Sequence, residues 1–323
     1  MTASATLPER ASPHALRRPL EWPTLLVTVA IYGGFILLTW FYHALPWWLV
    51  LPAGAWLLAW HGSLQHEAMH GHPTRRRWLN ELFVLPNLWL WMPYRIYRDT
   101  HLAHHRDERL TDPLDDPESF YMTAADWQRL SPVMRFVMRV RNTVAGRLLL
   151  GPAIAVIALL RQEIPRLMRG ERRAVKAWAL HVPAVALVLF WVVAVCGIPL
   201  IEYLALFVYP GISLTLLRSF AEHRAEEDPE NRSVVVEASW PLALLFLNNN
   251  LHWLHHHEPG IPWYALPQRY REHRDAVLAA NGNYRFRGYC EILSSYLFTA
   301  KEPVVHPEYR DAQAEVPSTQ RSV

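Results

Sequence analysis

Four apolar stretches constrain the fold most strongly, because each approaches the length that a helix needs to cross a bilayer. They cover residues 24–42, 47–61, 177–197 and 198–217. A spanning helix takes about 20 predominantly apolar residues, so the second stretch is short unless it continues into the residues after it. Residues 43–46 and 197–199 form short turns between neighbouring stretches. The sequence therefore predicts an all-α integral membrane protein with four transmembrane helices in two hairpins.

The basic residues predict how these helices are oriented. None of the 32 Lys and Arg residues lies in an apolar stretch or in either turn. They lie before the first stretch, between the second and third, and after the fourth, and regions rich in Lys and Arg face the cytoplasm. We therefore expect both termini and the middle region to be cytoplasmic, in a bacterial inner membrane. No nucleic acid partner is expected.

Two shorter apolar runs, residues 82–92 and 148–160, fall outside this scheme. Each contains a proline, and runs of this length are more often interfacial or re-entrant than spanning. We expect both at the membrane surface, since a crossing by either one would break the orientation argument. Residues 1–302 are expected to form one membrane domain, and the polar residues 303–323 a disordered tail.

Most of the 17 histidines lie in three tight clusters or stand alone close to a predicted span. The clusters are His66, His70 and His72; His101, His104 and His105; and His252, His255, His256 and His257; the isolated residue is His223. Spacings of three and four residues place side chains on one face of a helix. All these residues lie on the predicted cytoplasmic side, so we expect a helical cap to bring them together there.

Neutral imidazole is a common metal ligand, and one metal takes about four ligands. Nine imidazoles meeting at one place would therefore suit two metals. The candidate ligands are His66, His70, His101, His104, His105, His223, His252, His255 and His256. His72 is offset from the face of His66 and His70, and it is a further ligand, a hydrogen-bond donor to a ligand, or neither. His257 would point away from its cluster and is left out.

The kind of metal follows from the ligands and from the chemistry needed beside a membrane. All-imidazole ligation without thiolate suits iron, copper, nickel or zinc, and Cys196 and Cys290 have no cysteine nearby. A metal pair beside apolar helices points to a lipid substrate. Attack on its unactivated C–H bonds requires an oxidant made from O₂, which iron commonly provides. We therefore expect two iron ions, while the residues alone leave zinc open.

Two other interpretations use the same residues differently. Glu67 lies between His66 and His70, as in the His-Glu-x-x-His motif of zinc proteases, but a protease would leave the other clusters unexplained. A non-enzymatic metal transporter or sensor would place ligands inside the spans. The clear ionisable candidates there are His181 and Glu202. Neither interpretation accounts for the clusters outside the spans.

Three segments resemble the histidine boxes of a known family: His66-Glu-Ala-Met-His70, His101-Leu-Ala-His104-His105 and His252-Trp-Leu-His255-His256. On these segments, and over most of its length, the chain resembles the membrane fatty acid desaturases and hydroxylases. The resemblance implies a di-iron enzyme that uses O₂ to insert a double bond into a fatty acyl chain of a lipid. Hydroxylation of a fatty acid or lipid, and ketolation or hydroxylation of a carotenoid, remain alternatives at the same site.

The resemblance also implies a further ligand and a redox partner. Members of the family often add a histidine between the last span and the third box, where His223 is the only candidate. The chain carries no His-Pro-Gly-Gly motif of a fused heme domain. Electrons would then come from a separate ferredoxin, rubredoxin or b-type cytochrome with its reductase. Candidates for orienting the histidine rings through hydrogen bonds are Asp99, Asn248, Asn249 and Asn250.

Overall fold

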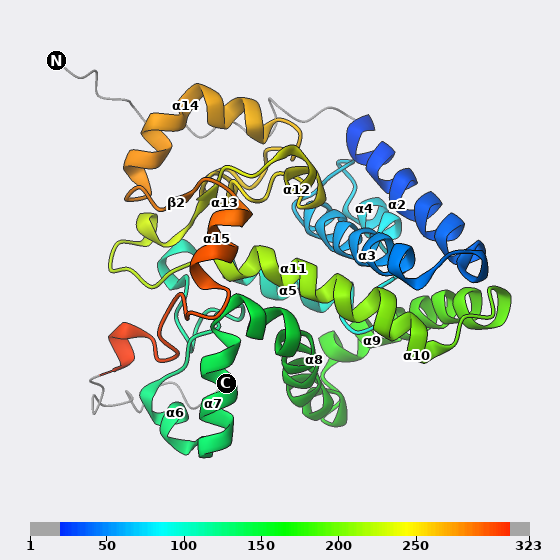
Figure 1. Ribbon diagram of the computed structural model, residues 1–323, viewed down its shortest axis with the longest axis horizontal. Helices are drawn as coiled ribbons and strands as arrows, with labels where there is room; N and C mark the ends of the chain where they lie inside the picture. The colour runs from blue at the N-terminus through cyan, green and yellow to red at the C-terminus, as the bar shows by residue number, and fades with distance from the viewer. Residues whose placement is uncertain (1–19, 311–323) are drawn as a thin grey trace.

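The structure is a computed structural model that describes residues 20–310. Helices make up most of it, and the sheet in the described part is a parallel pair of short strands, β1 (Val235–Val236) and β2 (Arg285–Phe286). In Figure 1 the long helices gather at one end, and the short helices and strands of the C-terminal half lie at the other. The predicted all-α class is confirmed.

Three long helices form the centre of the apolar end: α2 (Trp22–Trp40), α3 (Trp47–Met69) and α11 (Tyr209–Glu222). They pack closely, α3 lying against both α2 and α11. A Cβ atom on Gly211 would lie 2.6 Å from the Cβ of Leu58, so only glycine permits this approach of α11 to α3. The turn predicted at residues 43–46 is present as the short helix η1 (Tyr42–Ala44).

The second predicted turn is also present. Helix α9 (Arg172–Leu189) continues through the π-helical η3 (Phe190–Val195), and α10 (Leu200–Tyr203) continues through η4 (Leu204–Val208) into α11. Between them Gly197 has φ +67°, a left-handed conformation that glycine adopts without steric cost. The chain therefore reverses where the sequence places Gly197 and Pro199.

Four described helices are long and apolar enough to cross a membrane, and three of them correspond to the predicted spans 24–42, 177–197 and 198–217. The four are Trp22–Trp40, Val144–Met168, Arg172–Val195 and Leu200–Glu222. The predicted span 47–61 is the first part of α3, which is absent from this set and whose last turns carry the polar residues Gln65, His66 and Glu67. The fourth helix of the set is α8 (Val144–Met168), which the sequence did not predict as a span.

The expectation that residues 148–160 form only a short run was therefore wrong. The run is the middle of a 25-residue helix that contains both Pro152 and Pro165. The other short run, residues 82–92, is mostly irregular and packs into the core. Its Trp89 is 4% exposed and donates from its indole nitrogen to the carbonyl of Leu58, at 2.6 Å.

Shorter elements surround the end of α3 and α11 from which the histidines come. They are α4 (Arg77–Phe83), α5 (Tyr94–His104), η2 (Asp107–Arg109), α6 (Ala124–Arg129), α7 (Pro132–Arg141), η5 (Pro229–Arg232), α12 (Trp240–Leu245), α13 (His252–His257), α14 (Leu266–Ala280), α15 (Tyr289–Tyr296) and η6 (Pro307–Tyr309). Val305 bridges to Met122, and His306 is 2% exposed. The chain thus stays packed beyond the predicted boundary at residue 302, while residues 311–323 of the predicted tail lie outside the described part.

Candidate metal centre

Four segments, far apart in sequence, bring the predicted ligands together. His66 lies in the last turn of α3 and His70 caps that helix. The last turn of α5 carries His101 and His104, and His105 caps it. Helix α13 is a single short helix that holds the third cluster. His223 directly follows α11. Helix ends thus supply all nine side chains at the boundary between the apolar bundle and the rest of the chain.

The nine histidines form two groups. The first histidine group is His66, His70, His101, His105 and His255, and the second histidine group is His104, His223, His252 and His256. Within each group, one ligand atom from every residue lies within 4.8 Å of the others. This division is a property of the fold, because neighbours in sequence such as His104 and His105 belong to different groups.

The rings point their Nε2 atoms at one another. In the first group the Nε2 atom of His101 lies 3.1 Å from that of His70 and 3.0 Å from that of His105. In the second, the Nε2 atom of His223 lies 3.0 Å from that of His104 and 2.9 Å from that of His252. The two groups adjoin, since the rings of His105 and His256 stack with centroids 4.2 Å apart.

Such an arrangement fits a metal ion at the centre of each group. Buried polar atoms need partners, and several converging ring nitrogens cannot all satisfy one another. A cation between them would accept a lone pair from each. The donor set of four or five imidazoles without thiolate suits iron, copper, nickel or zinc.

Burial keeps most of these rings in the neutral form that binds metals. Among the seven rings outside α3 and its cap, burial lowers the pKa of six well below the usual value, and neighbouring histidines add to the effect; these are His101, His105, His223, His252, His255 and His256. His104 is different: burial opposes its protonation, but the carboxylates of Glu118, Asp116 and Glu222 outweigh burial and raise its pKa to about 9. The second group therefore lies in a negative environment that favours a cation.

Comparison with known families agrees with this geometry. The model of the fatty acid desaturase family matches residues 40–288, a segment that contains all nine histidines. The chain belongs to the fatty acid desaturase family. No curated protein gives a significant match. Family membership makes this protein an oxidoreductase, and together with the apolar helices it indicates an integral membrane protein with a lipid substrate.

Behind the histidines of this desaturase-family site lies an acidic loop. The Nδ1 atom of His104 donates to Asp116 at 2.8 Å, and that of His101 donates to Glu118 at 3.1 Å. Asp116 is itself fixed, because it accepts from the backbone nitrogens of Thr111 and Glu118. Such bonds hold an imidazole with Nε2 free for a metal. No role was predicted for this loop, and its position just after the second box was the only signal in the sequence.

Of the four predicted orienting residues, one contacts the histidines. Asn249 lies 3.2 Å from the Nδ1 atom of His252 and 3.4 Å from the Nε2 atom of His66. Asn248 and Asn250 instead donate to backbone carbonyls, and Asp99 pairs with its neighbour Arg98. Two further contacts were missed. Glu222 lies 3.4 Å from the Nδ1 atom of His252, and Ser233 lies 3.3 Å from that of His223.

His72 belongs to neither histidine group. Its Nδ1 atom lies 2.6 Å from Glu21, and its Nε2 atom lies 4.0 Å from Glu67, in a separate buried cluster. Glu67 also accepts from the backbone nitrogen of Trp263 at 2.9 Å. His257 stacks on Trp253, with centroids 4.8 Å apart, and lies outside both groups as expected. Neither His72 nor Glu67 therefore faces the proposed metals.

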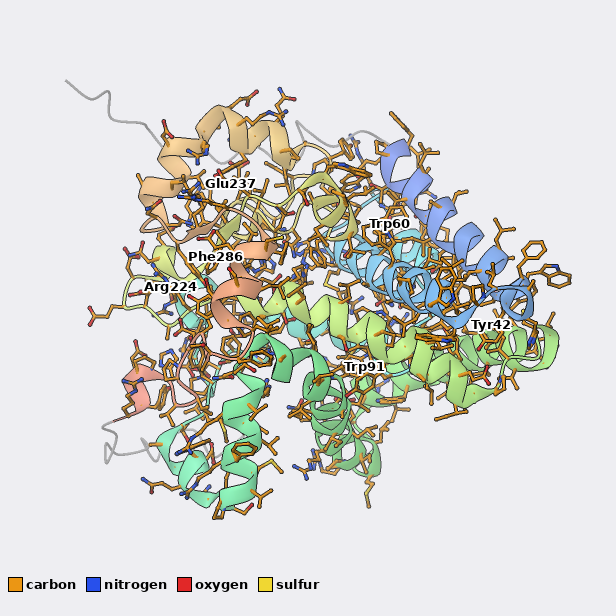
Figure 2. The ribbon with its side chains drawn as sticks, in the orientation of Figure 1. Tyr42, Trp60, Trp91, Arg224, Glu237 and Phe286 are labelled. Atoms are coloured by element: carbon orange, nitrogen blue, oxygen red, sulfur yellow. The ribbon has the colours of Figure 1, made fainter. Side chains whose placement is uncertain are left out.

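The ionisable residues of the spans have other partners. Glu202 accepts from the hydroxyl of Tyr42, which Figure 2 shows at the tip of the apolar end. His181 contacts the carbonyl of Leu90 at 3.1 Å. Both are thus accounted for by contacts that join helices or connecting segments. The fold brings no described histidine cluster into the middle of a span, as a metal transporter would require.

Proposed function

We propose that this protein is an O₂-dependent desaturase that uses two irons to insert a double bond into the acyl chain of a lipid. The observation that carries the proposal is the division of nine imidazoles into two adjoining groups. One metal would be satisfied by one group, and the second group would then have no purpose. Two neighbouring ions can share the electrons that are needed to reduce O₂ during a single turnover.

The first histidine group would hold one iron and the second the other. When bound, the pair and O₂ would supply an oxidant strong enough to take hydrogen from an unactivated methylene. The overall reaction converts –CH₂–CH₂– and O₂, with two electrons and two protons, into –CH=CH– and two waters. The substrate supplies the other two electrons, so a separate ferredoxin, rubredoxin or b-type cytochrome must deliver the first two.

The protein's own residues orient the metal ligands and the substrate and exclude water from the site. Glu118 and Asp116 hold His101 and His104 in fixed orientations. An apolar cluster adjoins the first group, since the ring of Tyr97 lies 6.1 Å from that of His101 and packs with the cluster's aromatic residues. We place the reacting methylenes on this side. Apolar walls would keep water out and hold one C–C bond next to the oxidant.

The site would face the cytoplasm of a bacterial inner membrane, with α8 lying along the membrane surface and α3 providing the fourth crossing. Contacts along α8 support this. Its first residue, Val144, packs in one cluster with Phe220, close to His223. Leu159 packs with Ile96 of α5, and Glu163 accepts from the indole nitrogen of Trp178 near the start of α9. We propose that both ends of α8 lie on the side of the histidines and that α8 does not cross, so the charge distribution favours a cytoplasmic site.

Lipid profiling of a host that expresses the wild type or His104→Ala tests the activity. We expect the wild type alone to give a lipid that is lighter by two hydrogens. A lipid that is heavier by one oxygen atom would show that the same site catalyses hydroxylation and not desaturation. Identical profiles from both proteins, despite equal amounts in the membrane, would contradict the proposal.

A further inference from the structure

The outer face of α5 carries a groove that the proposed reaction does not yet use. Its volume is about 550 Å³, and residues of α4, α5 and α9 line it together with Arg106. The lining comprises Glu81, Arg95, Arg98, Asp99, Leu102, Ala103, Arg106, Arg173 and Lys176. A second hollow of about 230 Å³ shares Arg95, Asp99, Ala103 and Arg173 with it and adds Arg166. We call the larger one the α5 groove.

The charge of the α5 groove is positive and only partly neutralised. Arg95 pairs with Glu81 at 2.6 Å, and Arg98 pairs with Asp99 at 2.7 Å. The other three cations, Arg106, Arg173 and Lys176, are exposed. Within residues 20–310 none of these three takes part in an ion pair. Three positive charges thus remain available to an acidic partner.

An apolar contact point lies among these charges. Leu102 is 42% exposed and lines the groove beside Ala103. A small apolar centre ringed by unpaired charge suits a transient protein complex, in which charge steers the encounter and the apolar centre gives contact. The headgroup of an anionic lipid would gain nothing from Leu102, whereas an apolar side chain of a docked protein would pack on it.

The groove lies directly behind the proposed metals. Leu102 and Ala103 separate His101 from His104 in the sequence, yet those histidines are 2% and 3% exposed and face the metal groups. The thickness of one helix, roughly 10–12 Å with its side chains, therefore separates a carrier in the groove from the site. Electrons tunnel readily through protein over such a distance.

We propose that the α5 groove docks an acidic one-electron carrier protein, which delivers electrons through α5 to the two metals. This inference rests on the proposed function, because only a reaction with O₂ needs an external reductant. Two reduced carriers would each be oxidised by one electron per turnover. These two electrons, two protons and the two hydrogens of the substrate then reduce O₂ to two waters.

The test uses the full-length, iron-loaded protein in phosphatidylcholine nanodiscs with its lipid substrate. One variant combines Arg106→Glu with Arg173→Glu, and a matched control combines Arg271→Glu with Arg287→Glu, two exposed arginines outside the groove. Ferredoxin binding to the nanodiscs is measured by surface plasmon resonance, and turnover is measured with reduced plant-type ferredoxin, an acidic carrier. Product yield of a single turnover is measured after anaerobic reduction with dithionite, a small reductant that needs no docking site, removal of its excess and addition of O₂. Iron content confirms that each variant keeps its site.

We expect the groove variant to lose roughly tenfold or more in kcat/KM for ferredoxin, because like charges slow a steered encounter. Its product yield with dithionite should equal that of the wild type, and the control should keep both activities. Equal ferredoxin kinetics in the groove and control variants would overturn the docking proposal. So would turnover by the wild type with dithionite but not with ferredoxin.

Two further outcomes distinguish failure of the docking proposal from failure of the proposed function. A loss by the groove variant with both reductants, seen only when phosphatidylglycerol is added to the nanodiscs, would assign the groove to lipid headgroups and overturn carrier docking. Absence of product from the iron-loaded wild type with either reductant would refute the proposed function itself.

Discussion

At the scale of single residues, the carboxylates behind the histidines determine how firmly the imidazole rings are oriented. Asp116 is 6% exposed and touches His104, whereas its neighbour Asp115 has a half-exposed side chain that pairs with Arg109. The two residues therefore form a matched pair in one loop. The same carboxyl chemistry serves the metal site at one position and the surface at the other.

Asp116→Asn should weaken iron binding or activity by about 10- to 100-fold, because His104 loses the charged acceptor that orients it. Iron per chain and product formation would be measured on purified protein. Asp115→Asn, the control, should leave both unchanged. If both variants behave alike, the loop does not act through His104.

A second carboxylate makes stability depend on pH. Glu237, labelled in Figure 2, contacts Arg274 at 2.7 Å and Arg285 at 2.6 Å, and so joins α14 to β2. Burial opposes its ionisation, but Arg274, Tyr270 and Arg285 outweigh burial and lower the pKa of Glu237 from 4.5 to about 2. A group with a depressed pKa stabilises the folded state above its unfolded pKa.

The melting temperature of Glu237→Gln should therefore lie below that of the wild type at pH 7. The gap should stay full down to about pH 4.5 and close as the pH falls toward 2, because the folded carboxyl is then protonated as well. Thermal unfolding in detergent across this range measures the gap. The control is Glu272→Gln, at an exposed residue of α14. A difference in melting temperature that does not change with pH would contradict the role of the Glu237 carboxylate.

At the scale of elements, the site depends on how α3 meets the irregular segment before α5. A Cβ atom on Gly62 would lie 1.9 Å from the ring of Trp89, which is buried and held by its bond to Leu58. This contact positions the segment that leads into α5 and hence His101. Gly33 on α2 has nothing within 4 Å of such an atom.

Gly62→Ala should thus destabilise the protein by about 1–3 kcal/mol, the usual cost of overpacking a core. It should also reduce bound iron, because Trp89 and the start of α5 must shift. Gly33→Ala should be neutral in both respects. Thermal unfolding with iron analysis makes the comparison, and an unaffected Gly62→Ala protein would mean that Trp89 can move freely.

At the scale of the whole molecule, the histidine positions were predictable, and much of what surrounds them was not. Spacings of three and four residues fix a helix face wherever the helix lies, so His101 and His104 could be found without coordinates. The role of Asp116 could not be predicted, because an acidic loop has the same sequence pattern whether it packs on a histidine ring or faces water. The place of His72 depends on the turn after Met69, which periodicity does not describe. The helix α8 is longer than the predicted run because it continues past the polar residues on either side of that run and contains both Pro152 and Pro165.

The placement of α8 makes a prediction about topology. In a background of Cys196→Ser and Cys290→Ser, a cysteine at Ala44 should react with a membrane-impermeant maleimide in intact cells. A cysteine at Arg169, just after α8, should react only after the membrane is opened, because the proposed topology places both ends of α8 on the histidine side. Labelling of the cysteine at position 169 in intact cells would mean that α8 crosses the bilayer.

The central claim is that two irons are held by two different sets of imidazoles. The most direct measurement is the Mössbauer spectrum of protein loaded with ⁵⁷Fe, with iron quantified per chain. Five imidazoles surround one position, while four surround the other next to Asp116, Glu118 and Glu222. We predict two irons per chain in two distinguishable environments of equal abundance. A single iron environment with one ion per chain, or a chain that retains no iron, would contradict the account.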